Sequence, residues 1–246
     1  MNLILLFAPD FVSSDTARLT GRRLRHVLDV LKPQVNDVLT VGLSGGKIGS
    51  GRVLELDEEA LLLAVALHEA PPPRIPVILC VALMRPIVLK RVLLTAASLG
   101  VEEVVLFNSA RVEKSFWQST ALSPAAIEEQ LILGVEQSKD TVLPKVTLQK
   151  RFKPFVEDDL PLLLQGRSGA GHLSGGPRYG IVADPAGEPL LALDVQIPAV
   201  IVVGPEGGLV PYEVTKFRTA GCKVVGLGKR ILKVETAIVT LLARFG

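Results

Sequence analysis

The first 70 residues carry short apolar stretches separated by turn residues. Runs such as LILLF (3–7), DVLTVGL (37–43) and EALLLAVAL (59–67) are bounded by Gly, Asn and Asp. Short apolar and β-branched runs between such signals predict strands. KIGSGRVLELD (47–57) is a fourth candidate, and the Arg-rich stretch 18–31 is the one predicted helix. We therefore expect a small β-barrel-like module at the N-terminus.

The pattern changes after HEAPPPRIP (68–76). Three consecutive prolines fit neither a helix interior nor a central strand, so we expect two domains, 1–70 and 71–246. The second half alternates strand-like and helical patterns. The predicted strands are 76–83, 102–110, 180–184, 199–203 and 222–227, and the predicted helices are 86–99 and 124–138. Such alternation is typical of a mostly parallel α/β sheet with helices on both faces.

Residues 150–178 give the weakest pattern of the chain. They begin with an apolar turn and end in a stretch rich in Gly and Ser, which predicts a mobile surface connection. GAGHLS (169–174) lacks the third glycine of a dinucleotide fingerprint, and no predicted strand leads directly into it. We therefore expect no nucleotide-binding role for this segment.

Composition restricts the class of protein. With 246 residues, 48% of them hydrophobic, the chain can bury a substantial core. Its apolar runs, such as 60–67, are far shorter than the roughly 18 residues of a membrane span. The N-terminus has no basic leader or cleavage site, so we expect a cytoplasmic protein without membrane contact. Cys80 and Cys222 lie in apolar, strand-like surroundings typical of buried thiols.

Charge is distributed unevenly, although the net charge is only +2. Residues 18–32 hold five cations against the single acid Asp29, a local excess of four. Cations grouped in this way can bind a nucleic-acid backbone, although a solvated helix face without a partner has the same pattern. The candidate RNA-binding residues are Arg22, Arg23, Arg25, His26 and Lys32.

Several familiar chemistries have no support in the sequence. The three histidines share no metal-ligand spacing, and no Ser lies in a G-x-S-x-G elbow. GLSGGKI (42–48) does not fit the phosphate-loop spacing. We expect no metal and no covalent mechanism, which leaves a chemistry in which the protein binds, orients and excludes water.

Two motifs near the C-terminus each join a strand end to a glycine turn. GPEGGL (204–209) follows a β-branched run and precedes a helical pattern, and LGKRILKVETA (227–237) leads into the C-terminal helix. A glycine-rich turn at the carboxyl end of a strand typically holds a small ligand. Together the two motifs resemble those of the RsmE family of ribosomal RNA methyltransferases, in the SPOUT superfamily. SLGVEEVVLF (98–107) and GVEQSKDTVLP (134–144) resemble the family more loosely, and RHVLDVLKPQVNDVLTV (25–41) resembles a PUA-like RNA-binding module.

The resemblance implies a fold, a reaction and a site. The fold would be a trefoil-knotted sheet at 71–246 after a PUA-like barrel at 1–70, working as a homodimer. The reaction would transfer a methyl group from S-adenosylmethionine to N3 of a uridine in 16S ribosomal RNA, free or within the small ribosomal subunit. Arg230, Glu206 and Glu235 would be catalytic. The residues that would bind the cofactor are Val203, Gly204, Pro205, Glu206, Gly207, Gly208, Leu227, Gly228, Ile231, Leu232 and Thr236.

Departures from the family pattern leave two alternatives. Asp29, Ser98 and Lys233 stand where the family usually has Arg, Glu and Arg. A knotted RNA-binding or ribosome-assembly protein that has lost catalysis would fit these changes. The other alternative is a different SPOUT activity, such as ribose 2′-O methylation of transfer RNA, although KVETA (233–237) differs from the corresponding segment of those enzymes.

Overall fold

The computed structural model describes residues 2–168, 171–172, 176–190 and 198–245. The chain divides into two compact units. The first comprises Met1–Pro73 with Ile132–Leu143, and the second comprises Arg74–Leu131 with Pro144–Gly246. Within the described ranges, no helix is long and apolar enough to cross a lipid bilayer.

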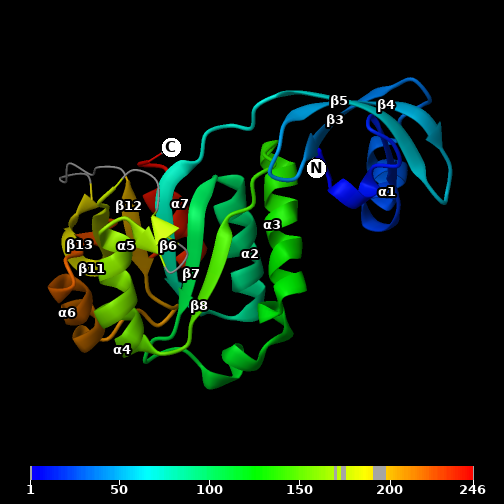
Figure 1. The fold of residues 1–246 in the computed structure, drawn as a ribbon. Coiled ribbons are helices and arrows are strands. Elements are labelled where there is room, and N and C mark those ends of the chain that lie inside the picture. The colour runs from blue at the N-terminus through cyan, green and yellow to red at the C-terminus, as the bar shows by residue number, and fades with distance from the viewer. Residues whose placement is uncertain (1, 169–170, 173–175, 191–197, 246) are drawn as a thin grey trace. The chain divides into compact units, whose positions relative to one another are not determined.

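The first unit is built on a five-stranded sheet in the order β1-β3-β4-β5-β2. Figure 1 labels β3, β4 and β5 of this sheet. Its elements are β1 (Ile4–Leu6), η1 (Ala8–Asp10), β2 (Thr16–Leu19), α1 (Gly21–His26), the π-helical turn η2 (Val27–Leu31), β3 (Val38–Leu43), β4 (Ile48–Leu56) and β5 (Leu61–Glu69). The pairs of β3, β4, β5 and β2 are antiparallel, and β1 pairs with β3 in parallel. The four strands predicted from the sequence are confirmed.

The helix expected over residues 18–31 begins later than predicted. Thr16–Leu19 is strand β2, which buries Ala17 and Leu19 and exposes Arg18. Side chains that alternate between buried and exposed are typical of a strand. β2 accordingly pairs with β5 along its whole length. The helical part therefore starts at Gly21 and ends at Leu31.

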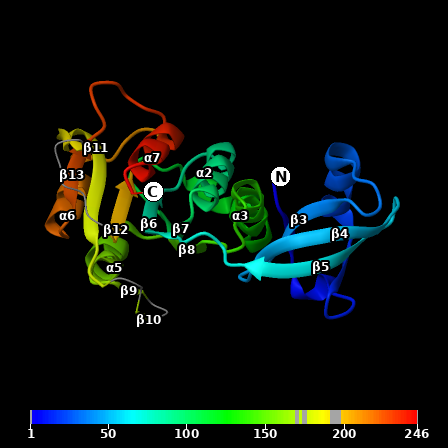
Figure 2. The same cartoon turned by 90° about the horizontal axis from the view of Figure 1, so that it is seen from above.

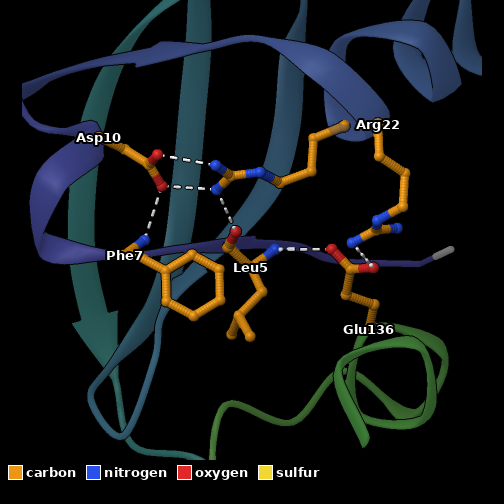
Figure 3. A network of polar contacts seen from close by, with 6 residues as sticks. Leu5, Phe7, Asp10, Arg22 and Glu136 are labelled. Atoms are coloured by element: carbon orange, nitrogen blue, oxygen red, sulfur yellow. Dashed lines mark hydrogen bonds and ion pairs between the residues drawn. The ribbon is translucent and has the colours of Figure 1, made fainter. Parts of the chain in front are cut away.

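A segment distant in the sequence completes the first unit. Figure 3 shows Glu136, from the last turns of α3 (Pro124–Ser138), beside Leu5 of β1. The Leu5 amide donates to Glu136 Oε1 at 3.2 Å. The backbone carbonyl of Glu136 also accepts from the amides of Asn2 and Leu3. Further along, the Thr141 hydroxyl donates to the Gly46 carbonyl at 2.6 Å. Residues 132–143 therefore satisfy backbone groups of β1 and of the β3–β4 turn.

The second unit contains a six-stranded sheet in the order β13-β11-β12-β6-β7-β8. Its strands are β6 (Ile75–Ala82), β7 (Val101–Phe107), β8 (Lys145–Gln149), β11 (Tyr179–Pro189), β12 (Ala199–Val203) and β13 (Lys223–Gly226). Every neighbouring pair is parallel, as predicted. All five residues of β12 are buried, as a strand covered on both faces requires.

Helices cover both faces of this sheet (Figure 2). On one face lie α2 (Pro86–Ser98) and α7 (Val234–Leu242), and on the other lie α5 (Leu160–Leu164) and α6 (Pro211–Thr219). The α5–α6 face has a core in which Phe107, Phe155 and Phe217 pack together, with ring centroids 5.0–6.4 Å apart. The sequence prediction of an α/β sheet with helices on both faces is confirmed.

The prediction of a mobile surface connection over residues 150–178 is wrong for the first half of this segment. After β8, α4 (Phe152–Pro154), the π-helical turn η5 (Phe155–Asp159) and α5 form one helical segment. Phe155 and Leu160 are fully buried in it. Two short strands, β9 (Arg167–Ser168) and β10 (Gly171–His172), follow. The rest of GAGHLS, residues 169–170 and 173–174, lies outside the described residues.

Candidate functional site

A pocket of about 280 Å³ lies at the carboxyl edge of the six-stranded sheet. The loop after β12 and the loop after β13 line most of it, and the middle of β11 and the start of α7 complete it. The lining residues are Ala183, Asp184, Pro185, Val203, Gly204, Pro205, Glu206, Gly207, Gly208, Leu209, Val225, Leu227, Gly228, Arg230, Ile231, Leu232, Val234 and Ala237. The two glycine motifs, 18 residues apart in the sequence between Leu209 and Leu227, thus form one site.

Local geometry explains why glycines occur in both loops. Gly208 has φ +74° and Gly228 has φ +111°. A residue with a side chain adopts such positive φ values only at a cost in free energy, whereas glycine adopts them readily. A Cβ atom on Gly204 would lie 2.9 Å from Leu209 Cγ, which is too close. The loop after β12 therefore turns back on itself tightly, and its backbone forms the wall of the pocket.

Two side chains join this loop to the segment after β7. Glu213, 2% exposed, accepts hydrogen bonds from Ser109 Oγ (3.1 Å), the Ala110 amide (2.7 Å) and the Val210 amide (3.0 Å). Arg111 donates from Nη1 to the Gly207 carbonyl. The loop after β12 is therefore fixed at Gly207 and again at Val210, where it leads into the next helix.

The pocket brings together ten of the eleven residues predicted to bind a cofactor. Thr236 is the exception: it is exposed and does not line the pocket, whereas its neighbour Ala237 does. In α7 the side chains of successive residues point about 100° apart, so a helix can present only one of the two to the pocket. The role of all these residues in binding remains a prediction.

The three predicted catalytic residues have different surroundings. Arg230 lines the pocket, is exposed and makes no ion pair with any described residue. Glu206 also lines the pocket, and its Oε1 accepts from the Arg85 amide, at the start of α2, at 3.4 Å. Glu235 does not line the pocket, and its Oε1 lies 3.6 Å from Nη1 of Arg91. Glu235 is therefore paired with Arg91.

Some residues of the site lie outside the two glycine motifs. Ala183, Asp184 and Pro185 interrupt β11 where its register against β13 shifts. The signal was the D-P pair in the middle of an apolar run, which is typical of a turn or a bulge. Arg111 had no detectable signal, because its contact with Gly207 spans 96 positions.

In the first unit, two of the predicted RNA-binding arginines have partners within the protein (Figure 3). Arg22 Nη2 lies 2.9 Å from Glu136 Oε2. Arg23 makes a bidentate ion pair with Asp10 (2.5 and 2.7 Å) and donates a hydrogen bond to the Leu5 carbonyl. Only 17% of the Arg23 side chain is exposed. Both arginines therefore stabilise the first unit, and little of Arg23 remains for an external ligand.

The other three candidates differ in exposure. Arg25 and Lys32 are exposed and make no ion pair within the described ranges. His26 is half-buried, and its Nε2 atom is buried without a hydrogen-bond partner. Burial lowers the pKa of His26 below its usual value. A lowered pKa favours the neutral imidazole, so His26 contributes less than a free histidine to the basic surface.

The remaining candidate groups of the chain have structural surroundings. Cys80 and Cys222 are buried free thiols, as predicted, and burial raises the pKa of Cys222 to about 12. The described residues contain no cluster of three or more His, Cys, Asp or Glu side chains that could hold a metal ion.

The second unit is a parallel sheet, and glycine loops surround a pocket at its carboxyl edge. This arrangement defines a class of α/β protein that binds a small ligand at the ends of its strands. Within that class, the chain belongs to the RNA methyltransferase domain family, whose sequence model matches residues 71–246. The protein is therefore a methyltransferase, and the resemblance drawn from the two C-terminal motifs is confirmed.

Relatives of known name align over nearly the whole chain. Ribosomal RNA small subunit methyltransferase E 1 of Borreliella burgdorferi is 24% identical over 245 residues, covering 97% of this chain and 94% of that protein. Ribosomal RNA small subunit methyltransferase E of Treponema pallidum is 29% identical over 238 residues, covering 95% and 86%.

Solved structures share the fold. Ribosomal RNA small subunit methyltransferase E from Neisseria gonorrhoeae, bound to S-adenosyl methionine, superposes with a TM-score of 0.73 at 20% identity and covers 98% of this chain and 96% of that one. A putative methyltransferase from Legionella pneumophila, in complex with the same cofactor, gives a TM-score of 0.75 at 19% identity and covers 100% and 97%.

Proposed function

We propose that the protein methylates N3 of a uridine in small-subunit ribosomal RNA, with S-adenosylmethionine as the methyl donor. The observation that carries this proposal is the pocket itself. Both glycine motifs that resemble the RsmE family line it, and its volume of about 280 Å³ is near the lower end of small-molecule sites, roughly 300 Å³. The names of the relatives support ribosomal RNA as the substrate.

The pocket residues fit the proposed cofactor. Val203, Leu209 and Val225 give an apolar floor suited to an adenine ring, and the loop backbones offer N–H and C=O groups to its edge. Asp184 and Glu206 are the acids of the lining, and carboxylates suit a ligand that carries sulfonium and ammonium charges. When bound, S-adenosylmethionine supplies an electrophilic methyl group.

Arg230 is the residue proposed to assist the transfer. N3 of uracil must lose its proton as it accepts the methyl group, and negative charge then spreads onto the ring oxygens. An unpaired guanidinium at the pocket wall stabilises that charge. Glu206 lines the same pocket, and we propose that its carboxylate accepts that proton. Because Glu235 is paired with Arg91, we propose that its role is to position α7.

The proposal extends to the fold and assembly. We propose that the second unit is knotted, as the resemblance of its two glycine motifs to the SPOUT superfamily implies. We propose that the first unit is PUA-like and contacts RNA through Arg25 and Lys32. A homodimer would bury the exposed apolar side chains Ile87, Ile231 and Val239.

Two measurements test this function. Titration calorimetry should show S-adenosylmethionine binding to the purified protein, and no heat of binding would favour a non-catalytic assembly role. Nucleoside mass spectrometry of 16S RNA from a deletion strain should show loss of one N3-methyluridine, restored by the wild-type gene. A complete complement of N3-methyluridine in that strain would exclude the proposed substrate.

A further inference from the structure

Cations gather at the carboxyl edge of the six-stranded sheet. β6, β7 and β8 are adjacent and parallel, so the segments that follow them begin at the same edge. Each segment carries exposed basic side chains. We call them the carboxyl-edge strip: Arg85 after β6, Arg111 and Lys114 after β7, and Lys150, Arg151 and Lys153 after β8. The loop that lines the pocket follows β12, the other neighbour of β6, so the strip starts beside the pocket.

The cations of the strip are unpaired within the part of the chain that the structure describes. None of its six cations forms an ion pair with a residue in the described ranges, and Glu113 is the one acid in segments 83–86, 108–118 and 150–154. Of the acids outside these segments, Glu206 accepts from the Arg85 backbone amide at 3.4 Å, and Glu157 is bound to Lys216 at 2.6 Å.

The opposite edge of the same sheet is different. At the amino ends of the strands, Arg178 lies 2.5 Å from Glu102, and Lys145 lies 3.5 Å from Glu103. These two cations are paired within the fold, whereas the six cations of the strip make no ion pair with a described residue. The strip thus places unpaired charge on the side of the sheet where the pocket lies.

Packing holds the strip in place. The Phe152 ring packs against Phe217 and Tyr212, with centroids 5.6 and 6.3 Å apart, and this anchors the segment after β8. The buried Glu213 carboxylate binds the Ala110 amide and anchors the segment after β7. The cations therefore extend from fixed backbone, so little order must be gained when a ligand binds.

We propose that the carboxyl-edge strip binds the phosphate backbone of the substrate RNA on one side of the target nucleotide. The proposal rests on the proposed function, because it assumes an RNA acceptor at the pocket. Three adjacent strands span about 10 Å, a distance that covers a few nucleotides. Phosphate contacts position a nucleic acid without reading its sequence, and unpaired Lys and Arg side chains supply them. An acidic protein segment would satisfy the charge alone, but it would place no base at the pocket.

The test uses the full-length protein and an unmodified 16S RNA transcript as the probe. Lys114, Arg151 and Lys153 are changed together to Gln, since none of them contacts the pocket loop. Affinity is measured between 50 and 500 mM salt. Three lost phosphate contacts should flatten the log–log salt dependence by about 2–3 and weaken binding at 0.1 M salt by about 100- to 500-fold. S-adenosylmethionine binding should not change.

A charge-matched variant provides the control. Arg167, Arg218 and Lys223 are exposed cations toward the amino edge of the sheet, and changing them to Gln removes the same charge. The proposal is refuted if the strip variant keeps the wild-type salt dependence of RNA binding, or if the control variant loses as much RNA affinity as the strip variant. Because RNA affinity is measured without cofactor, a wild-type protein that binds RNA but transfers no methyl group would refute the proposed function and leave the strip intact.

Discussion

Replacing the buried Glu213 carboxylate should destabilise the second unit and loosen the pocket. Glu213→Ala removes the acceptor of three hydrogen bonds, from Ser109, Ala110 and Val210. A hydrogen bond to a charged group contributes about 1.5–3 kcal/mol, and water can reach part of the exposed Ala110 backbone. We therefore expect a loss of about 3–5 kcal/mol in the free energy of unfolding, and about half of that for Glu213→Gln, which keeps one acceptor.

The single tryptophan makes the measurement specific. Trp117 lies in η3 (Lys114–Gln118), on the segment that Glu213 holds, and its Nε1 donates to Asn108 Oδ1 at 2.9 Å. Its fluorescence during urea unfolding therefore reports this part of the second unit. The control is Glu157→Gln, an exposed acid that should leave the transition unchanged. If Glu213→Ala unfolds at the wild-type urea concentration, the carboxylate does not support the loops as argued.

Three further predictions concern single residues. Arg230→Ala should lower single-turnover methyl transfer by about 100-fold or more and change S-adenosylmethionine affinity only a few-fold; a wild-type transfer rate would rule out its catalytic role. Gly208→Ala should cost about 1 kcal/mol in urea unfolding, because φ is +74° but the nearest atom to a new Cβ is 3.8 Å away; a cost of 3 kcal/mol or more would indicate a clash instead. Glu136→Ala should destabilise the first unit by about 2–4 kcal/mol and Arg22→Ala by less, since 39% of the Arg22 side chain is exposed and can be rehydrated; the reverse order in thermal unfolding would contradict this account.

The elements of the second unit could largely be predicted from the sequence. β6, β7 and β12 are apolar runs between clear turn signals, and Ser123-Pro124 marks the start of α3. The helical segment over residues 152–164 could not, because Pro154 and Pro161 in it are typical of a loop. Each proline stands close to a junction between helical turns of different type, where its missing N–H removes little hydrogen bonding. Strand β8 is short and polar on one side, so its pattern was too weak to detect.

The basic segment 18–32 shows what a charge pattern leaves undetermined. Five cations within 15 positions predict a surface that binds an anion. Two of them instead find anions inside the fold: Asp10 lies 13 positions from Arg23, and Glu136 lies 114 positions from Arg22. The first partner is close in sequence, but the second depends on α3 returning to β1. Local sequence therefore reveals that charge is present, and only the fold reveals whether that charge is already used.

The pocket was predictable for a related reason. Its two glycine motifs follow strands β12 and β13, and parallel strands of one sheet bring their carboxyl ends to the same edge. Proximity of the motifs thus follows from topology without any knowledge of side-chain contacts. The carboxyl-edge strip obeys the same rule, since its cations also follow parallel strands. It was missed because six cations spread over positions 85–153 form no local cluster in the sequence. In an enzyme of this architecture, the strand end that a cation follows therefore predicts a shared surface better than its distance from other cations in the sequence.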